Sequence, residues 1–336
     1  MQAGNEQSAP RVLVTGANGF LGSEIVRQLA AAGIQMRATS RHPLARADLD
    51  YLPADILQPA SLDLVFDGIE SVIHTAGLAH IFDKTRATTD RFKNVNERGT
   101  ANVAQAATRA GVRHFVLISS VSIYGSSTKS AYDEQVPCRP ETPYAESKYE
   151  AEQRAIEIAE RSGMALTVLR LATIYGEGDP GNVVRLIRAI DKGRFLWIGN
   201  GANRKSLIHR DDAARACLRA ILHPCSGIEI YNVAAQSYTM REVVEGLAAA
   251  LKLTLPHWSI PTPLARRSAE ILSRLAGRRS RFGDLQMTLE KWLAEDVYDT
   301  TKFQQAFDFQ PEIGLIEGLR REVAWYRNQT YRASSV

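Results

Sequence analysis

The chain has few cysteines, no long apolar run and only a small excess of one charge. Its 336 residues include three cysteines, Cys138, Cys217 and Cys225, and no two of them have a zinc-binding or disulfide-framework spacing. No run of about 18 apolar residues is present, so we expect no membrane-spanning helix. A net charge of +4 is too small to indicate nucleic-acid binding. These absences favour a cytoplasmic protein that has no metal site and that binds small anionic molecules.

The two ends of the chain are polar. Met1–Pro10 lacks the apolar core of a signal peptide. We expect this segment and Tyr331–Val336 to be disordered.

Short apolar runs alternate with amphipathic stretches through the first half of the chain. Strands are predicted at Val12–Thr15, Met36–Thr39, Ser71–His74, His114–Ser119 and Thr167–Leu171. Helices are predicted at Ser23–Ala32, Ser61–Phe66, Glu97–Ala110 and Tyr144–Ser162. Such alternation is typical of a parallel sheet covered by helices on both faces. The predicted fold class is α/β, a Rossmann-type doubly wound sheet of about seven strands with a smaller C-terminal α/β lobe.

The order of elements changes after about residue 170. Strands are predicted at Phe195–Ile198, Ser206–Ile208 and Glu229–Val233, and helices at Val183–Lys192, Asp211–Leu222 and Met240–Leu251. We therefore expect a tail at 1–10, a dinucleotide-binding domain at 11–170, and a mainly substrate-binding lobe at 171–330 with some strands returning to the main sheet. Six arginines between Arg266 and Arg281 could bind a diphosphate, bind anionic lipid or simply be solvated.

The first predicted strand runs directly into a turn with three glycines, Gly16, Gly19 and Gly22. A turn this tight needs a backbone with positive φ and no side chain in the way. The helix that follows presents unpaired N–H groups and a partial positive charge to phosphates. Gly22 lets that helix pack closely on the strand. The pattern predicts a site for the diphosphate of a dinucleotide.

Tyr144 and Lys148 stand four residues apart at the start of a predicted helix, so their side chains share one face. An ammonium beside a phenol stabilises phenolate and lowers the pKa of the tyrosine toward neutrality. Tyrosine can then act as an acid–base catalyst. A buried strand upstream ends in a serine cluster, Ser119, Ser120 and Ser122, where a hydroxyl could hold the substrate oxygen near Tyr144.

With these motifs the chain resembles an extended short-chain dehydrogenase/reductase of the NAD(P)-dependent sugar-nucleotide epimerase/dehydratase superfamily, from Val12 to about Tyr326. The resemblance implies an NAD(P)-dependent oxidoreductase or epimerase with Ser120, Tyr144 and Lys148 as its catalytic residues. Ser120 is chosen because the Ser/Thr-x-x-x-Tyr-Gly motif of the family matches Ser120–Gly125. The implied cofactor contacts are Gly16, Gly19, Phe20, Leu21, Gly22, Asp55, Ile56, Thr75, Ala76, Gly77, Asn96, Tyr144, Lys148 and Leu171.

Three positions depart from the family pattern. Leu171 replaces a usual proline and Thr173 a usual asparagine, both beside the nicotinamide or the substrate. The second strand ends in Ser40 and Arg41, where an NAD-preferring enzyme usually has an acidic residue for the adenosine ribose. A hydroxyl and a guanidinium suit a 2′-phosphate. We therefore expect Ser40 and Arg41 to contact the cofactor and NADP to be preferred, with NAD as the alternative.

The segment Asn203–Leu207 resembles bacterial UDP-N-acetylhexosamine 4-epimerases and 4-ketoreductases of surface polysaccharide synthesis. The expected substrate is thus a nucleotide-diphosphate sugar, with a UDP-hexosamine favoured. Its candidate ligands are Ser120, Ser122, Thr173, Asn182, Arg204 and Lys205. Two alternatives stay open: a reductase like the 3β-hydroxysteroid dehydrogenases, which Ile260–Gly277 resembles and whose lobe would touch a membrane surface, and a non-catalytic dinucleotide sensor. The family also implies a homodimer through Glu97–Ala110 and Tyr144–Ser162.

Overall fold

A computed structural model describes residues 11–42, 49–79, 81, 85–126, 131–276 and 285–334. The tail expected at 1–10 and the arginines Arg278, Arg279 and Arg281 lie outside the described residues. At the other end, helix α12 (Leu315–Ser334) continues past Tyr331, where we had expected disorder to begin.

Six parallel strands form the main sheet of the described residues, in the order β2-β1-β3-β4-β5-β9. They are β1 (Val12–Thr15), β2 (Met36–Thr39), β3 (Ser71–His74), β4 (His114–Ser120), β5 (Ala165–Leu171) and β9 (Ile228–Val233). The fold class predicted from the sequence is confirmed. The main sheet has six strands instead of about seven because β6 (Thr173–Tyr175) and β8 (Arg204–His209) pair with each other in a separate sheet.

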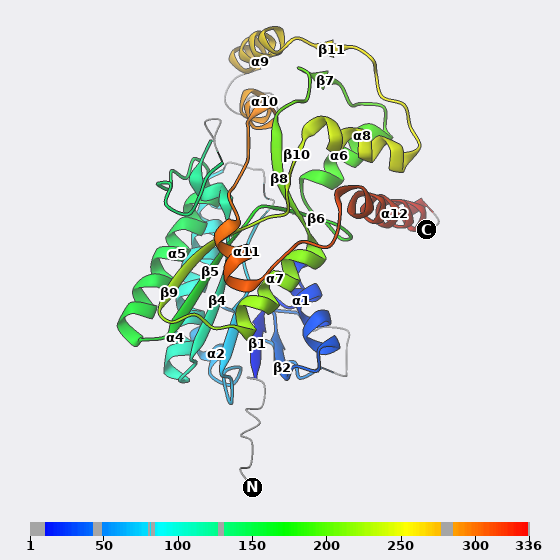
Figure 1. The fold of residues 1–336 in the computed structure, drawn as a ribbon. Helices are drawn as coiled ribbons and strands as arrows, with labels where there is room; N and C mark the ends of the chain where they lie inside the picture. The colour runs from blue at the N-terminus through cyan, green and yellow to red at the C-terminus, as the bar shows by residue number, and fades with distance from the viewer. Residues whose placement is uncertain are drawn as a thin grey trace.

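Helices cover both faces of the main sheet (Figure 1). One face carries α1 (Phe20–Ala31), α7 (Arg210–Leu222) and α11 (Thr301–Phe307), and the other carries α2 (Pro59–Leu62), α4 (Gly99–Arg109) and α5 (Pro143–Ser162). The strands are largely apolar because both faces of the sheet are covered by helices. A π-helical turn at Lys93–Arg98 leads from α3 (Arg86–Phe92) into α4, and a 3-10 turn at Val121–Tyr124 follows β4.

The second lobe lies beyond the carboxyl edge of the main sheet (Figure 1). Its small sheet has the order β10-β8-β6, with β10 at Ser237–Thr239. Packed around it are α6 (Asn182–Asp191), α8 (Met240–Leu251) and α12, and farther out lie β7 (Trp197–Ile198), β11 (Ser259–Ile260), α9 (Thr262–Ala276) and α10 (Leu285–Leu293). None of the helices in the described ranges is both long and apolar enough to cross a membrane.

Candidate active site

The glycine turn after β1 is built to receive a diphosphate. Gly16 has φ +69°, and a Cβ on Gly22 would overlap the carbonyl oxygen of Gly16. Helix α1 begins at Phe20, three residues earlier than predicted, and its N-cap Gly19 makes no side-chain cap. The first N–H groups of α1 are therefore left for an anion, with no side chain in the way. These residues fit the pyrophosphate of a dinucleotide.

The loop after β3 packs directly on this turn. A Cβ on Gly16 would lie 2.7 Å from the Cα of Ala76, and Thr75 donates from Oγ1 to the carbonyl oxygen of Thr15 at 2.6 Å. His74 is buried between the hydroxyls of Thr15, at 2.7 Å, and Thr100, at 3.0 Å. Burial, with the charge of Lys148 adding to it, lowers the pKa of His74 to about 3, so its ring is neutral. By bonding to Thr15 and Thr100, His74 fixes the end of β3 and so the positions of Thr75 and Ala76.

Asn96 connects two segments of the site through three side-chain hydrogen bonds. Its Oδ1 accepts from the backbone N–H of Leu78 at 2.7 Å, and its Nδ2 donates to the Leu78 carbonyl at 3.0 Å and to Ser147 Oγ at 2.9 Å. Asn96 therefore ties the loop after Gly77 to the first turn of α5. Asn96 therefore positions this loop, and its predicted contact with the cofactor stays a prediction.

Asp55 and Ile56, two of the predicted cofactor contacts, are held in place by local interactions. Asp55 Oδ1 accepts from the backbone N–H of Leu57 at 3.0 Å, which fixes the local turn. Ile56 is buried and packs against Gly99, where a Cβ would collide with its side chain. Gly99 therefore serves close packing, a role that the sequence motif alone does not reveal.

The end of β2 differs from the prediction in one respect. Ser40 is buried, and its hydroxyl donates to the carbonyl of His42 at 2.8 Å and lies 3.1 Å from the hydroxyl of Tyr51. Ser40 is thus already engaged within the chain. Arg41, by contrast, is exposed. Among the described residues at this edge, Arg41 is therefore the candidate to contact a 2′-phosphate.

Two of the three predicted catalytic residues meet at the carboxyl end of β4. The side chain of Ser120 lies beside the hydroxyl of Tyr144. Burial raises the pKa of Tyr144 above its ordinary value, and the neighbouring Ser120 hydroxyl opposes this shift. We had expected Lys148 to lower this pKa. The structure shows the opposite direction, because the Lys148 ammonium is directed at the Ile118 carbonyl instead.

The ammonium of Lys148 donates to the backbone carbonyl of Ile118 in β4. Burial lowers the pKa of Lys148 to about 8, and the charge of Glu152 one turn later opposes that shift. The charge of Lys148 is therefore held against β4. Leu171 was also predicted to touch the cofactor, but its side chain is buried in the core shared with α1 and α7.

A buried ionic network that we did not predict includes Glu152, whose charge acts on Lys148. Glu152 receives hydrogen bonds from Ser119 and from Arg170, whose Nη2 lies 2.8 Å from Oε2. Arg170 also donates to the hydroxyl of Tyr124 at 2.8 Å, which donates in turn to Asn232 Oδ1 at 2.8 Å. The network joins β4, β5, β9 and α5. An arginine inside the apolar run of β5 was the sequence signal that could have revealed it.

The predicted substrate residues are divided by the structure. Lys205 Nζ donates to Asp296 Oδ2 at 2.6 Å and to the carbonyl of Lys291 at 2.8 Å. Lys205 was predicted to bind the diphosphate, but these two bonds already engage its ammonium group. Arg204, its neighbour, points to the opposite face of β8 and is exposed, with one bond from Nη2 to the Ser237 carbonyl at 3.2 Å. Adjacent residues on a strand cannot both face the same ligand.

The other predicted substrate residues lie along the lobe. Thr173 on β6 and Asn182 at the start of α6 are exposed. Ser122 has a buried hydroxyl with no hydrogen-bond partner, and its backbone N–H donates to Ser120 Oγ at 3.2 Å. A buried hydroxyl without a partner next to Ser120 is consistent with a ligand contact.

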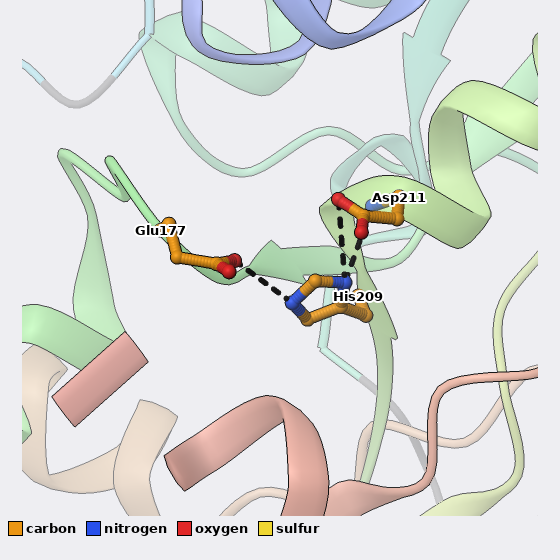
Figure 2. Close-up of side chains that lie close together, drawn as sticks. All are labelled: Glu177, His209 and Asp211. Carbon is orange, nitrogen blue, oxygen red and sulfur yellow. Dashed lines mark hydrogen bonds and ion pairs between the residues drawn. The ribbon is translucent and has the colours of Figure 1, made fainter. Parts of the chain in front are cut away.

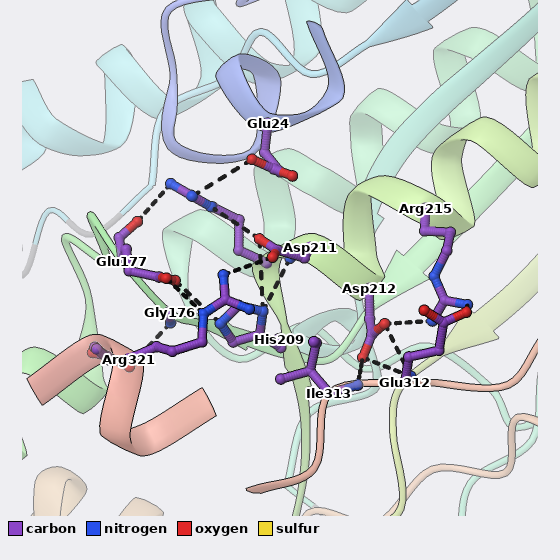
Figure 3. Close-up of polar contacts among 12 residues, drawn as sticks. Glu24, Gly176, Glu177, His209, Asp211, Asp212, Arg215, Glu312, Ile313 and Arg321 are labelled. Atoms are coloured by element: carbon purple, nitrogen blue, oxygen red, sulfur yellow. Dashed lines mark hydrogen bonds and ion pairs between the residues drawn. The ribbon is translucent and has the colours of Figure 1, made fainter. Parts of the chain in front are cut away.

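A second unpredicted cluster joins the lobe to the dinucleotide domain. His209, at the end of β8, lies between Glu177 and Asp211 (Figure 2). Arg321 of α12 donates to both carboxylates at 2.7 Å (Figure 3). The side chains of Glu177, His209 and Asp211 lie close enough together to hold a metal ion. Arg321 already supplies the positive charge that a cation would bring, so the cluster acts as a clamp on α12.

Asp212, near the start of α7, does not cap that helix. The N-cap of α7 is His209, whose Nδ1 accepts from the backbone N–H of Asp211 at 3.2 Å. Asp212 is buried and accepts from the backbone N–H groups of Glu312, at 3.1 Å, and Ile313, at 2.9 Å (Figure 3). It therefore anchors the segment that leads into α12.

The carboxyl group of Glu322 gives a pH prediction. Burial, reinforced by the negative charge of Asp179, raises the pKa of Glu322 to about 9. The folded state therefore keeps this proton between about pH 4.5 and pH 9, whereas the unfolded chain releases it, so stability falls as pH rises through this window. The wild type should lose up to about 1.4 kcal/mol of unfolding free energy per pH unit relative to Glu322→Gln. Urea unfolding at pH 5, 6.5 and 8 measures the difference, with the exposed Glu245→Gln as control. Parallel curves for wild type and Glu322→Gln would contradict the prediction.

The family model described as NAD dependent epimerase/dehydratase family matches residues 12–234, which include the glycine turn, Ser120 and Tyr144. The chain belongs to this family. Three curated relatives match nearly full length. UDP-glucose 4-epimerase of Vibrio cholerae is 27% identical over 96% of this chain and 97% of its own length. N-acetyl-alpha-D-glucosaminyl-diphospho-ditrans,octacis-undecaprenol 4-epimerase of Escherichia coli O157:H7 is 27% identical, covering 94% of each chain. Ceramide reductase of Caulobacter vibrioides is 30% identical, also covering 94% of each.

A solved structure of MoeE5 in complex with UDP-glucose and NAD superposes with a TM-score of 0.74 at 26% identity, over 95% of this chain and 99% of that one. As a family member, the chain is an enzyme of the extended short-chain dehydrogenase/reductase type, with NAD-dependent epimerases and dehydratases as its relatives.

Proposed function

We propose that the protein is a 4-epimerase or 4-ketoreductase of a nucleotide-diphosphate sugar, with a UDP-hexosamine as the favoured substrate. The observation that carries the proposal is the side chain of Ser120 beside the hydroxyl of Tyr144 at the carboxyl end of β4, on the same edge of the sheet as the glycine turn. An acid–base tyrosine and a dinucleotide cradle on one sheet edge are what hydride transfer at a carbinol carbon needs. The named relatives that act on nucleotide-linked or diphosphate-linked sugars support the substrate class.

Each protein group has a distinct task in this chemistry. A bound nicotinamide dinucleotide supplies the hydride acceptor or donor. Ser120 holds the oxygen of the reacting carbon, and Tyr144 removes its proton during oxidation or returns one during reduction. Lys148, one turn after Tyr144 on α5 and bonded to the Ile118 carbonyl, supplies the positive charge that favours the phenolate.

A second function is favoured by one comparison. Ceramide reductase is 30% identical to the chain, so reduction of a lipid carbonyl by the same residues is the alternative. The deciding assay offers the enzyme a panel of UDP-sugars, 4-keto-sugars, sterols and long-chain ketones, with NMR of the products and absorbance of the reduced nicotinamide. Turnover of a UDP-sugar supports the proposal, with no net cofactor consumption for an epimerase and stoichiometric consumption for a reductase. Turnover of a lipid ketone or a sterol with no response to any sugar would overturn it.

Arg41 should select the cofactor. We propose NADP in preference to NAD, because Arg41 is exposed at the end of β2 and the strand ends without a carboxylate. Arg41→Ala should weaken NADP binding by roughly 1.5–3 kcal/mol, typical of a charge-assisted hydrogen bond, and leave NAD nearly unchanged. Calorimetric titration of both cofactors measures this, with Arg161→Ala, exposed at the far end of α5, as control. Tighter NAD binding in the wild type, or equal weakening of both cofactors, would contradict it.

Two further expectations stay predictions. Helices α4 and α5 lie side by side on one face of the sheet, as the expected homodimer through these helices requires (Figure 1). Light scattering at micromolar concentration tests the homodimer. The expected cytoplasmic location is likewise a prediction.

A further inference from the structure

Helix α9 buries small residues and exposes large ones. Ala265 and Ala269 pack in a small cluster with Leu289 of α10. Leu264 and Ile271, seven residues apart on another face of α9, are each 56% exposed. A surface helix normally buries its largest apolar residues and exposes its small and polar ones. The reversed pattern marks the face with Leu264 and Ile271 as a contact surface, which we call the α9 face.

Other large apolar residues continue toward the strand before α9. Trp258 is 58% exposed and directly precedes β11, and Leu196 is 45% exposed and directly precedes β7. Because Ser259 pairs with Trp197, Leu196 and Trp258 lie next to each other at the start of this two-stranded ribbon. Figure 1 shows β11 and α9 together at the outer end of the lobe. Tryptophan is enriched where an apolar surface meets water and lipid headgroups.

The charge of the segment identifies the partner. Arg267 lies between Leu264 and Ile271 on the α9 face and is exposed. The sequence from Thr262 to Arg281 contains six arginines and one acidic residue, Glu270. Two copies of so basic a segment would repel each other, which argues against self-association. A basic helix with exposed leucine, isoleucine and a nearby tryptophan fits the anionic surface of a phospholipid bilayer.

We propose that the α9 face docks the protein on anionic membrane surfaces, with Leu264 and Ile271 among the headgroups and Arg267 on lipid phosphates. Helix α10, which follows α9, is bonded to β8 through Lys205 Nζ and the carbonyl of Lys291 at 2.8 Å. Docking therefore brings the end of the lobe formed by α9 and α10 to the bilayer. The proposal is independent of the proposed reaction.

Flotation of the full chain with vesicles tests this surface directly. The wild type should float with vesicles containing phosphatidylglycerol, float poorly with phosphatidylcholine alone, and lose binding as salt is raised. The double variant Leu264→Gln/Ile271→Gln should bind about tenfold more weakly or worse, because it removes two apolar side chains from the contact. Arg267→Glu should also weaken binding to phosphatidylglycerol. Leu64→Gln, at a leucine 79% exposed after α2, is the matched control and should bind like the wild type.

The thermal midpoint and light scattering of each variant are measured alongside, so that a folding defect or a change of oligomer is visible. Unchanged midpoints with weakened flotation support the proposal. Failure of the wild type to float with phosphatidylglycerol vesicles overturns it, as does flotation of a folded double variant that equals the wild type. A double variant that breaks an oligomer, with no vesicle binding by either protein, assigns the face to contacts between copies and also overturns the proposal.

Discussion

Tyr144→Phe should lower turnover by on the order of 10² or more, the contribution of a positioned acid–base group. The change removes only the hydroxyl that lies beside Ser120, and it keeps the ring, which meets Phe92 edge-on with the ring centroids 5.8 Å apart. Stability and cofactor affinity should therefore stay near their wild-type values. Steady-state kinetics with the substrate found in the panel, together with a cofactor titration, measures the effect.

Tyr149→Phe is the matched control for this variant. Tyr149 lies on the same helix, but it packs against the apolar cluster around Tyr124 instead of meeting Ser120. It should turn over substrate at nearly the wild-type rate. Near-normal turnover in Tyr144→Phe with cofactor still bound would refute the catalytic assignment, and it would favour the non-catalytic sensor that the sequence left open.

Glu152→Gln should lower the free energy of unfolding by about 3–5 kcal/mol, the cost of leaving a buried charge without its partner. Both side chains are buried, with 0% of Glu152 and 5% of Arg170 exposed, and Arg170 Nη2 lies 2.8 Å from Glu152 Oε2. The amide keeps the shape and accepts one hydrogen bond but removes the charge. Urea unfolding monitored by circular dichroism measures the loss.

Arg154→Gln, on an exposed turn of the same helix, should leave the unfolding midpoint nearly unchanged. The double variant Glu152→Gln/Arg170→Met should be less destabilised than the sum of its single variants, because neither residue then leaves an unpaired charge. The Glu152 carboxylate also opposes the lowering of the pKa of Lys148. Glu152→Gln should therefore lower that pKa further and move the pH profile of turnover to lower pH. A loss below about 1 kcal/mol, as for an exposed pair, would show that the network does not bear on folding.

The clamp around His209 shows how the lobe is fixed to the dinucleotide domain. Arg210 donates to the carbonyl of Glu177 at 2.6 Å and lies 5.6 Å from the centre of the Phe20 ring, next to the glycine turn. Arg321 reaches the same cluster from α12. One group of charges therefore joins β6, β8, α7 and α12 to the start of α1, which sets the lobe relative to the cradle for the diphosphate.

The sequence by itself determined the parts of the protein that depend on local pattern. Alternating apolar runs and amphipathic stretches fixed the parallel sheet, and helix α8 was predicted at its observed bounds, because its period and its Thr239 cap are local signals. The glycine turn was also readable, since only glycine tolerates its positive φ and close contact. The spacing of Tyr144 and Lys148 placed both on one face of α5, because residues four apart lie one helical turn from each other.

Only the tertiary structure decided which polar atoms are free. Lys205 and Arg204 look alike in the sequence, but alternation along β8 points one at Asp296 and leaves the other exposed. The side chain of Asn96 hydrogen bonds to Leu78 and Ser147, partners 18 and 51 residues away along the chain. Lys148 turns to Ile118 because β4 places a carbonyl there. The partner of a buried polar group is set by segments distant in sequence, so residue type and spacing could nominate these side chains but not assign their contacts.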